Sequence, residues 1–189
     1  NPRKITFDEN KHKLEIEDSG CGMTKDELIQ AMQPASSNPL EDRPQNDLGR
    51  FGWGLKSASF SQAQKLIVSS KRQGIQSLAV WDLENIADFE MELLDEEDAK
   101  LILEDYDEEL QSDGTLIIWD NCDRLTDSNE ISQKEFNEKI MEARDQLALV
   151  FHQFLVQSSN RKLTILLNGL EIEGYDPFLS SHPATQASH

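Results

Sequence analysis

Two short stretches of this chain carry residues that suit the binding of a phosphorylated ligand. The first, Asp18-Ser19-Gly20-Cys21-Gly22, supplies a carboxylate and two positions without a side chain. The second, residues 49–58, reads Gly-Arg-Phe-Gly-Trp-Gly-Leu-Lys-Ser-Ala. A glycine turn that leads into a helix leaves backbone N–H groups free to receive phosphate oxygens, and Lys56 adds a positive charge nearby. Together the two stretches predict a nucleotide pocket.

Asp18 has the chemistry to recognise one base. A carboxylate accepts a hydrogen bond from the exocyclic amine of adenine, and guanine does not present that amine. Gly20 and Gly22 would let the backbone pass close to the ring. The pair Gly114-Thr115 adds a hydroxyl that suits the same edge of the base, directly or through water. Taken singly, the first motif also fits an Asx turn and the second a helix with a glycine N-cap.

The pattern around the first motif predicts the elements that hold it. Residues 4–8 and 13–17 alternate apolar and polar side chains, as a β-hairpin does, and lead into Asp18. Thr24 and Glu27 have the spacing of a capping box, which predicts a helix that ends by residue 34. Residues 34–48 contain three prolines and no apolar periodicity, which indicates a surface loop.

The rest of the chain predicts a mixed sheet with helices packed against it. The helix over 54–60 is expected to bury Leu55 and Ala58. A hairpin is expected around Asn168-Gly169, a strong turn signal. The further expected elements are strands over 65–70, 77–83, 89–93 and 115–119, and helices over 96–103 and 133–156.

Composition and charge exclude several classes of protein. The chain has 18 basic and 36 acidic residues and a net charge of −18, which opposes direct binding of nucleic acid. Two cysteines, neither at metal-ligand spacing, predict a reducing, cytoplasmic location. No apolar run approaches the ~20 residues that span a bilayer, so we expect a soluble protein without a membrane partner.

Asp18 to Gly22, Gly49 to Ala58 and Gly114-Thr115 resemble, in order, the second, third and fourth signature boxes of the GHKL ATPases. This superfamily includes gyrase-type topoisomerases, ninety-kilodalton heat-shock chaperones, MutL-type ATPases and histidine kinases. The segment from residue 47 to residue 60 is most similar to MORC-like and uncharacterised bacterial Hsp-type ATPases. The resemblance implies an α+β fold of the Bergerat type: a two-layer α/β sandwich with a mixed, mostly antiparallel sheet and helices on one face.

The resemblance also implies roles for single residues. Asp18 would bind the adenine amine with help from Thr115, and Gly52 to Lys56 would contact phosphates. Residues 34–50 would form a lid over ATP, from which Ser36, Ser37 and Arg50 would reach the phosphates. The implied ligand-binding residues are Asp18, Gly20, Gly22, Met23, Gly49, Arg50, Phe51, Gly52, Trp53, Gly54, Leu55, Lys56 and Thr115.

The first box of the family has no counterpart in this sequence. In the family it is a helix with a catalytic glutamate and a magnesium-binding asparagine, and it precedes the first strand. We therefore expect no catalytic or metal-binding residue here, and we expect a longer parent protein to supply both and to use Mg²⁺ with ATP. The expected division is an ATP-binding domain over 1–160 and, over 161–189, a hairpin and tail that begin a coupling domain.

Three functions remain open at this point. The resemblance favours the ATP-binding domain of an ATPase in which ATP or ADP controls the lid and a homodimer. A histidine kinase catalytic domain would transfer phosphate to a histidine instead of to water. A non-catalytic acidic interaction module would keep the fold without turnover.

Overall fold

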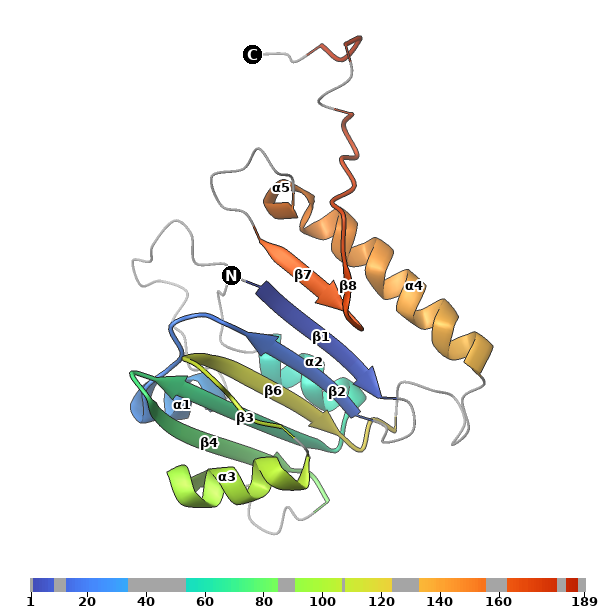
Figure 1. Ribbon diagram of the computed structural model, residues 1–189. Coiled ribbons are helices and arrows are strands. Elements are labelled where there is room, and N and C mark those ends of the chain that lie inside the picture. Colours follow the sequence, from blue (N-terminus) through green and yellow to red (C-terminus); the bar gives the residue numbers. More distant parts are fainter. Residues whose placement is uncertain are drawn as a thin grey trace.

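The computed structural model describes residues 2–8, 13–33, 54–84, 91–106, 108–123, 133–155, 163–179 and 183–186. Its eight strands form one sheet in the order β5-β4-β3-β6-β2-β1-β7-β8 (Figure 1). β1 and β7 pair in parallel, and the other neighbouring strands pair antiparallel. This confirms the predicted mixed, mostly antiparallel sheet. The strands are β1 (Pro2–Asp8), β2 (Lys13–Asp18), β3 (Lys65–Arg72), β4 (Ile75–Asp82), β5 (Glu92–Leu94), β6 (Gly114–Asp120), β7 (Thr164–Leu167) and β8 (Leu170–Glu171).

Five helices accompany the sheet within the described residues: α1 (Lys25–Met32), α2 (Gly54–Gln62), α3 (Glu96–Asp105), α4 (Gln133–Val150) and α5 (His152–Leu155). Leu28 and Met32 of α1 pack on Val68 and other residues of one sheet face. Helices α2, α4 and α5 pack against apolar residues of this same face. Leu103 of α3 packs instead with Ile67, whose side chain alternates to the other face.

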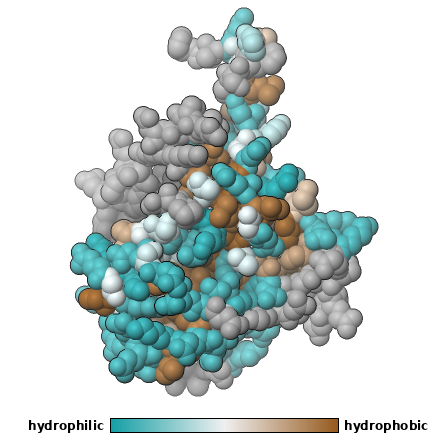
Figure 2. Space-filling view, viewed as in Figure 1, coloured by the Kyte–Doolittle hydropathy of each residue, from teal (hydrophilic) through white to brown (hydrophobic). Residues whose placement is uncertain are grey.

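The expectation of helices on one face is therefore wrong for α3, which Figure 1 shows in front of the strands, with α1 and α2 behind them. The physical reason lies in β3 and β4, which are apolar over successive residues and so need cover on both faces. Over α3 and β4 the surface is mainly hydrophilic (Figure 2), in keeping with the acidic first turn of α3.

Helix α1 starts where the sequence predicts. The Thr24 side chain accepts a hydrogen bond from the backbone N–H of Glu27, and the Glu27 carboxylate accepts one from the N–H of Thr24, so the capping box is complete. This cap fixes the direction of the chain immediately after the loop that follows Asp18.

Helix α2 has a different buried face from the one predicted. Lys56 and Ser59 are buried, whereas Leu55 is half-buried and Ala58 is exposed. Each buried polar group has a hydrogen-bond partner: Lys56 Nζ donates to the carbonyl of Ala31 (2.7 Å), and Ser59 Oγ donates to that of Leu55 (2.6 Å). Because these bonds compensate for burial, the helix is rotated relative to its apolar pattern.

The last strands belong to the same sheet. Asn168 and Gly169 form the predicted turn with φ angles of 47° and 79°, and Asn168 Oδ1 accepts a hydrogen bond from Phe7 N (2.9 Å). The long helix ends at Val150, six residues before the predicted end, and β5 begins at Glu92 instead of residue 89. The predicted domain boundary at residue 160 stays a prediction. No helix among the described residues is long and apolar enough to span a membrane.

A polar cluster includes two residues of β2 on the sheet face that α3 covers. Lys13 and Glu15 are buried and form an ion pair, and Lys13 Nζ also donates to the carbonyl of Tyr106 (3.0 Å). Glu108 shares a hydrogen bond with Glu15. Burial raises the pKa of Glu108 to about 7, and the hydrogen bond to Glu15 and the charges of Glu15 and Glu17 add to this effect. The charge of Lys13 acts in the opposite direction.

The raised pKa of Glu108 predicts a pH-dependent stability. The folded protein holds this proton more tightly than the unfolded chain, so the free energy of unfolding falls as pH rises from about 4.5 to about 7. Glu108→Gln removes the ionisation and should be more stable than the wild type at pH 8 by about 1 kcal/mol, since water partly screens this half-buried carboxyl. Urea denaturation at pH 4.5 and pH 8 measures the effect, with the exposed Glu109→Gln as the control. Equal pH profiles for wild type and Glu108→Gln would contradict this role.

Candidate functional site

Five side chains form a line across the sheet where the strands meet the Asp18 loop. The register pairs Ser77 with Ser70 and Ser70 with Thr115, and then Thr115 with Asp18 and Asp18 with Arg3. Directly paired residues point to the same face of a sheet. We call these five residues the polar row. It lies on the face covered by α1 and α2, since Val68, two positions before Ser70, packs against Leu28 of α1.

Ser70 links three separate segments of the chain at the centre of the polar row. This residue is fully buried, and its Oγ accepts a hydrogen bond from the backbone N–H of Met23 (2.8 Å). The same hydroxyl lies 3.0 Å from the carbonyl of Gly114 and 3.0 Å from Oγ1 of Thr115. One side chain therefore holds the loop after Asp18 against the start of β6.

Asp18 is the only carboxylate of the polar row. Its Oδ1 accepts a hydrogen bond from the backbone N–H of Gly20 (2.6 Å) and lies 3.6 Å from Nη1 of Arg3. Oδ2 has no hydrogen-bond partner among the described residues. Because the side chain is one-third exposed, one oxygen of Asp18 is fixed by the protein while the other can accept a hydrogen bond from a ligand.

Two glycines are required by the close approach of backbone segments. A Cβ at Gly22, where φ is 65°, would lie 1.9 Å from the carbonyl oxygen of Lys71. A Cβ at Gly114 would lie 2.2 Å from the carbonyl oxygen of Asp18. The sequence suggested that Gly22 makes room for a base. In the structure, the absence of a side chain at Gly22 lets the loop pack directly on the backbone of β3.

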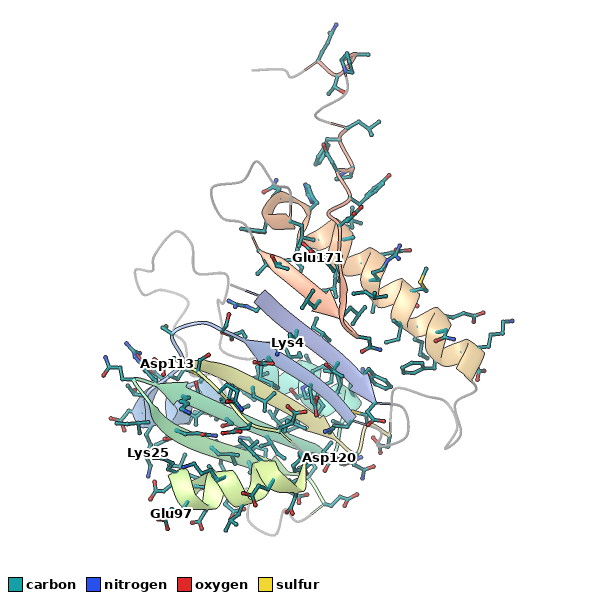
Figure 3. All side chains as sticks on the ribbon, in the orientation of Figure 1. Lys4, Lys25, Glu97, Asp113, Asp120 and Glu171 are labelled. Atoms are coloured by element: carbon teal, nitrogen blue, oxygen red, sulfur yellow. The ribbon has the colours of Figure 1, made fainter. Side chains whose placement is uncertain are left out.

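The turn between β3 and β4 is tied to the same end of β6. The carboxylate of Asp113, labelled in Figure 3, accepts hydrogen bonds from the backbone N–H groups of Gln73 (2.8 Å) and Gly74 (3.1 Å). These bonds, that of Gly74 first, hold the pKa of Asp113 below its usual value. Hydrogen bonds therefore connect the β3–β4 turn, the Asp18 loop and the start of β6 at one end of the strands.

Lys56 lies in the first turn of α2 and is 2% exposed. Its Nζ donates to the carbonyl of Ala31 near the end of α1, and burial lowers the pKa of this amine. An ammonium group has three N–H donors, and this contact uses one of them. Gly54, at the start of the same helix, is exposed, and a Cβ added there would meet no atom within 4 Å.

The structure places eight of the predicted ligand residues and brings several of them together. Asp18 and Thr115 are direct neighbours, and Met23 is bound to the same Ser70 hydroxyl as Thr115. Leu55 packs partly buried in the core beside α1. The predicted residues Gly49, Arg50, Phe51, Gly52 and Trp53, and the predicted lid over 34–50, lie outside the described residues.

Sequence reasoning missed Ser70 and Arg3. Both are parts of ordinary strand sequence, in which a serine or an arginine carries no local signal. Their positions follow only from the strand register, which aligns Ser70 with Thr115 and Arg3 with Asp18. The alternation of apolar and polar residues in each strand can predict the face on which a side chain lies, but it does not identify the residue that pairs with it.

A hollow lies away from the polar row. It has a volume of about 650 Å³ and lies between α4 and the segment after β8, and its lining includes Arg144, Glu171 and Tyr175. Figure 3 labels Glu171 at this end of the molecule, far from Lys25 at the start of α1. The hollow contains none of the predicted ligand residues. Among the described residues no group of three or more His, Cys, Asp or Glu side chains could hold a metal ion.

Comparison with known proteins identifies relatives of this chain. The family model of the histidine kinase-, DNA gyrase B- and HSP90-like ATPases matches residues 3–115, more than half of the chain. The chaperone protein HtpG of Bacillus velezensis is 36% identical over 102 residues, which cover 50% of this chain and 16% of HtpG. Heat shock protein 90-5 of Arabidopsis thaliana chloroplasts is 34% identical over 106 residues, 50% of this chain and 13% of that protein. The chain thus spans a small part of these relatives.

Solved structures of topoisomerase II share the fold. The ATPase region of the Saccharomyces cerevisiae enzyme bound to ICRF-187 aligns with a TM-score of 0.57 and 15% identity, over 91% of this chain and 43% of that chain. The ATPase and transducer domains of the Balamuthia mandrillaris enzyme align with a TM-score of 0.59 and 15% identity, over 92% and 43% of the two chains. At this identity the likeness concerns the fold alone.

The hydrogen bonds of Ser70 predict a large loss of stability on its truncation. Ser70→Ala leaves the N–H of Met23, the carbonyl of Gly114 and the Thr115 hydroxyl with one partner fewer, and should lower the free energy of unfolding by about 2–3 kcal/mol. Ser69→Ala is the matched control on the same strand. Its hydroxyl accepts one hydrogen bond, from Gln76, and its loss should cost about 1 kcal/mol. Urea denaturation measures both, and equal losses would contradict the linking role of Ser70.

Proposed function

Because this chain belongs to the family of histidine kinase-, DNA gyrase B- and HSP90-like ATPases, the GHKL type, we propose that its polar row and the Asp18 loop form an adenine-nucleotide site. The observation that carries the proposal is the position of Asp18. It stands in the row beside the Thr115 hydroxyl, with one oxygen bound to Gly20 and the other open. The local arrangement of Asp18 and Thr115 therefore suits a purine, in agreement with membership of the GHKL-type ATPase family.

Recognition of the base rests on Asp18 and Thr115. In the proposal, Asp18 Oδ2 accepts a hydrogen bond from the exocyclic amine of adenine, while the Gly20 N–H keeps Oδ1 in place. The Thr115 hydroxyl, oriented by Ser70, contacts the same edge through water. A hypoxanthine base carries a carbonyl oxygen in place of the amine, so it cannot donate to Asp18 at that position.

The phosphates would lie at the start of α2. The exposed Gly54 N-terminus offers backbone N–H groups, and Lys56 keeps two donors beyond the one that binds Ala31. The family resemblance adds residues 49–53 and Leu55 to the residues proposed to bind the nucleotide. Mg²⁺ would enter with the nucleotide, coordinated by phosphate oxygens.

The activity of the whole protein is a proposal as well. We infer that ATP is hydrolysed by the longer protein, and that ATP closes the lid and brings two copies together. The chaperones HtpG and heat shock protein 90-5 are the sequence relatives named above, which favours hydrolysis over transfer to a histidine. The net charge of −18 supports the absence of direct nucleic-acid contact, and the two cysteines support a cytoplasmic location.

Replacing Asp18 tests the base site. Asp18→Asn removes the charged acceptor and should weaken binding of ADP by a factor of about 10 to 100. Inosine diphosphate, which lacks the amine, should lose no affinity. Isothermal titration of both ligands, with and without Mg²⁺, measures this, with the exposed Asp26→Asn as control. If ADP binds equally to wild type and Asp18→Asn, the adenine assignment is wrong.

Replacing Lys56 tests the phosphate site. Lys56→Met removes an ammonium donor and should weaken binding of ADP about tenfold, while adenosine, which has no phosphate, keeps its affinity within about twofold. The exposed Lys25→Met is the charge-matched control, and calorimetry again provides the readout. An equal change for ADP and adenosine would mean that Lys56 only joins α2 to α1.

A further inference from the structure

Arg3 lies opposite Asp18 in the register of β1 and β2, at the end of the polar row, and the recognition of the nucleotide described above assigns it no contact with the ligand. Its Nη1 is 3.6 Å from Asp18 Oδ1, and both side chains are 33% exposed. Nη1 is buried and forms no hydrogen bond with the described residues. A guanidinium nitrogen in this position attracts the carboxylate mainly through its charge, because 3.6 Å is longer than an N–H···O hydrogen bond.

The Arg3–Asp18 pair lies on a different face of the sheet from the neighbouring ion pair of the hairpin. The neighbouring pair of the same hairpin, Lys4 with Glu17, is one register step away and therefore points to the opposite face. Lys4 is labelled in Figure 3 and has a side chain that is 54% exposed. Within the polar row, Arg3 is the only positively charged side chain, and it adjoins the only carboxylate.

The contacts of Asp18 divide its two oxygens. Oδ1 receives the Gly20 N–H and faces Arg3, so both attractions act on the same oxygen. The two oxygens are chemically equivalent, so a half-turn of the carboxylate restores the same arrangement, whereas a partial rotation would weaken both the hydrogen bond and the attraction to Arg3. A ligand that approaches the row therefore meets Oδ2 in one orientation, without reorganisation at the moment of binding.

We propose that Arg3 is a positioning residue for base recognition, which holds Asp18 so that Oδ2 is presented to the exocyclic amine of adenine. The inference rests on the proposed function. Arg3 acts through Asp18 and does not touch the base, so its effect concerns the amine contact alone. A guanidinium that served only to join β1 to β2 would affect every nucleotide equally.

The test compares two nucleotides that differ at the position Asp18 reads. ADP and inosine diphosphate are titrated into the wild-type chain and into Arg3→Met, and into both again with Asp18→Asn added. Arg3→Met should weaken ADP about five- to tenfold and change inosine diphosphate less than about twofold, so the preference for ADP falls by the same factor. In the Asp18→Asn background, Arg3→Met should change neither affinity.

Lys4→Met is the matched control, since it removes the same charge from the adjacent pair on the other face and should leave both affinities unchanged. Urea denaturation of each variant establishes that it is folded. If Arg3→Met does not fold, Arg3→Gln is measured under the same criteria, because it keeps a long polar side chain without the charge.

The outcomes separate the inference from the proposed function. Equal loss of ADP and inosine diphosphate affinity, or an unchanged preference for ADP, rejects the role of Arg3 while Asp18→Asn still weakens ADP. The same effect of Arg3→Met with and without Asp18 also rejects it. If Asp18→Asn leaves ADP binding unaltered, the adenine site itself is wrong and the inference falls with it.

Discussion

The register of the central strands is the constraint on which the site depends. Antiparallel pairing of β3, β6, β2 and β1 brings Ser70, Thr115, Asp18 and Arg3 into one line, although they are far apart in sequence. A slip of one residue at any pairing would turn a side chain to the opposite face. Val68 and Ile117, two positions from Ser70 and Thr115 on the same face, pack with residues of α1 and α2 and oppose such a slip, because it would expose them to water.

Local signals predicted much of this architecture. Short stretches of sequence determine three of the predicted features, because the residues involved lie within a few positions of one another. These are the β1–β2 hairpin, the capping box at Thr24 and the turn at Asn168-Gly169. The same holds for the candidate site. Asp18 and the pair Gly114-Thr115 belong to short motifs that gained their meaning from their order along the chain, and the structure places Asp18 and Thr115 side by side.

The features that the sequence did not reveal depend on contacts between distant segments. The buried face of α2 follows from the bond between Lys56 and Ala31, which an apolar pattern cannot show. Helix α3 covers the second face because β3 and β4 are apolar on both sides, a property of the whole sheet. Ser70 and Arg3 acquire their partners from strand pairing alone, and a serine or arginine in a strand has many equally ordinary settings.

The parallel pairing of β1 with β7 has a consequence for synthesis on the ribosome. β1 is synthesised before β7, so the edge of β1 that pairs with β7 has this partner only after Thr164–Leu167 has left the exit tunnel. Until then a strand with free N–H and C=O groups is available to other nascent chains. The charged side chains of Arg3 and Lys4 in this strand oppose such association, because charges along a strand disfavour pairing with another chain.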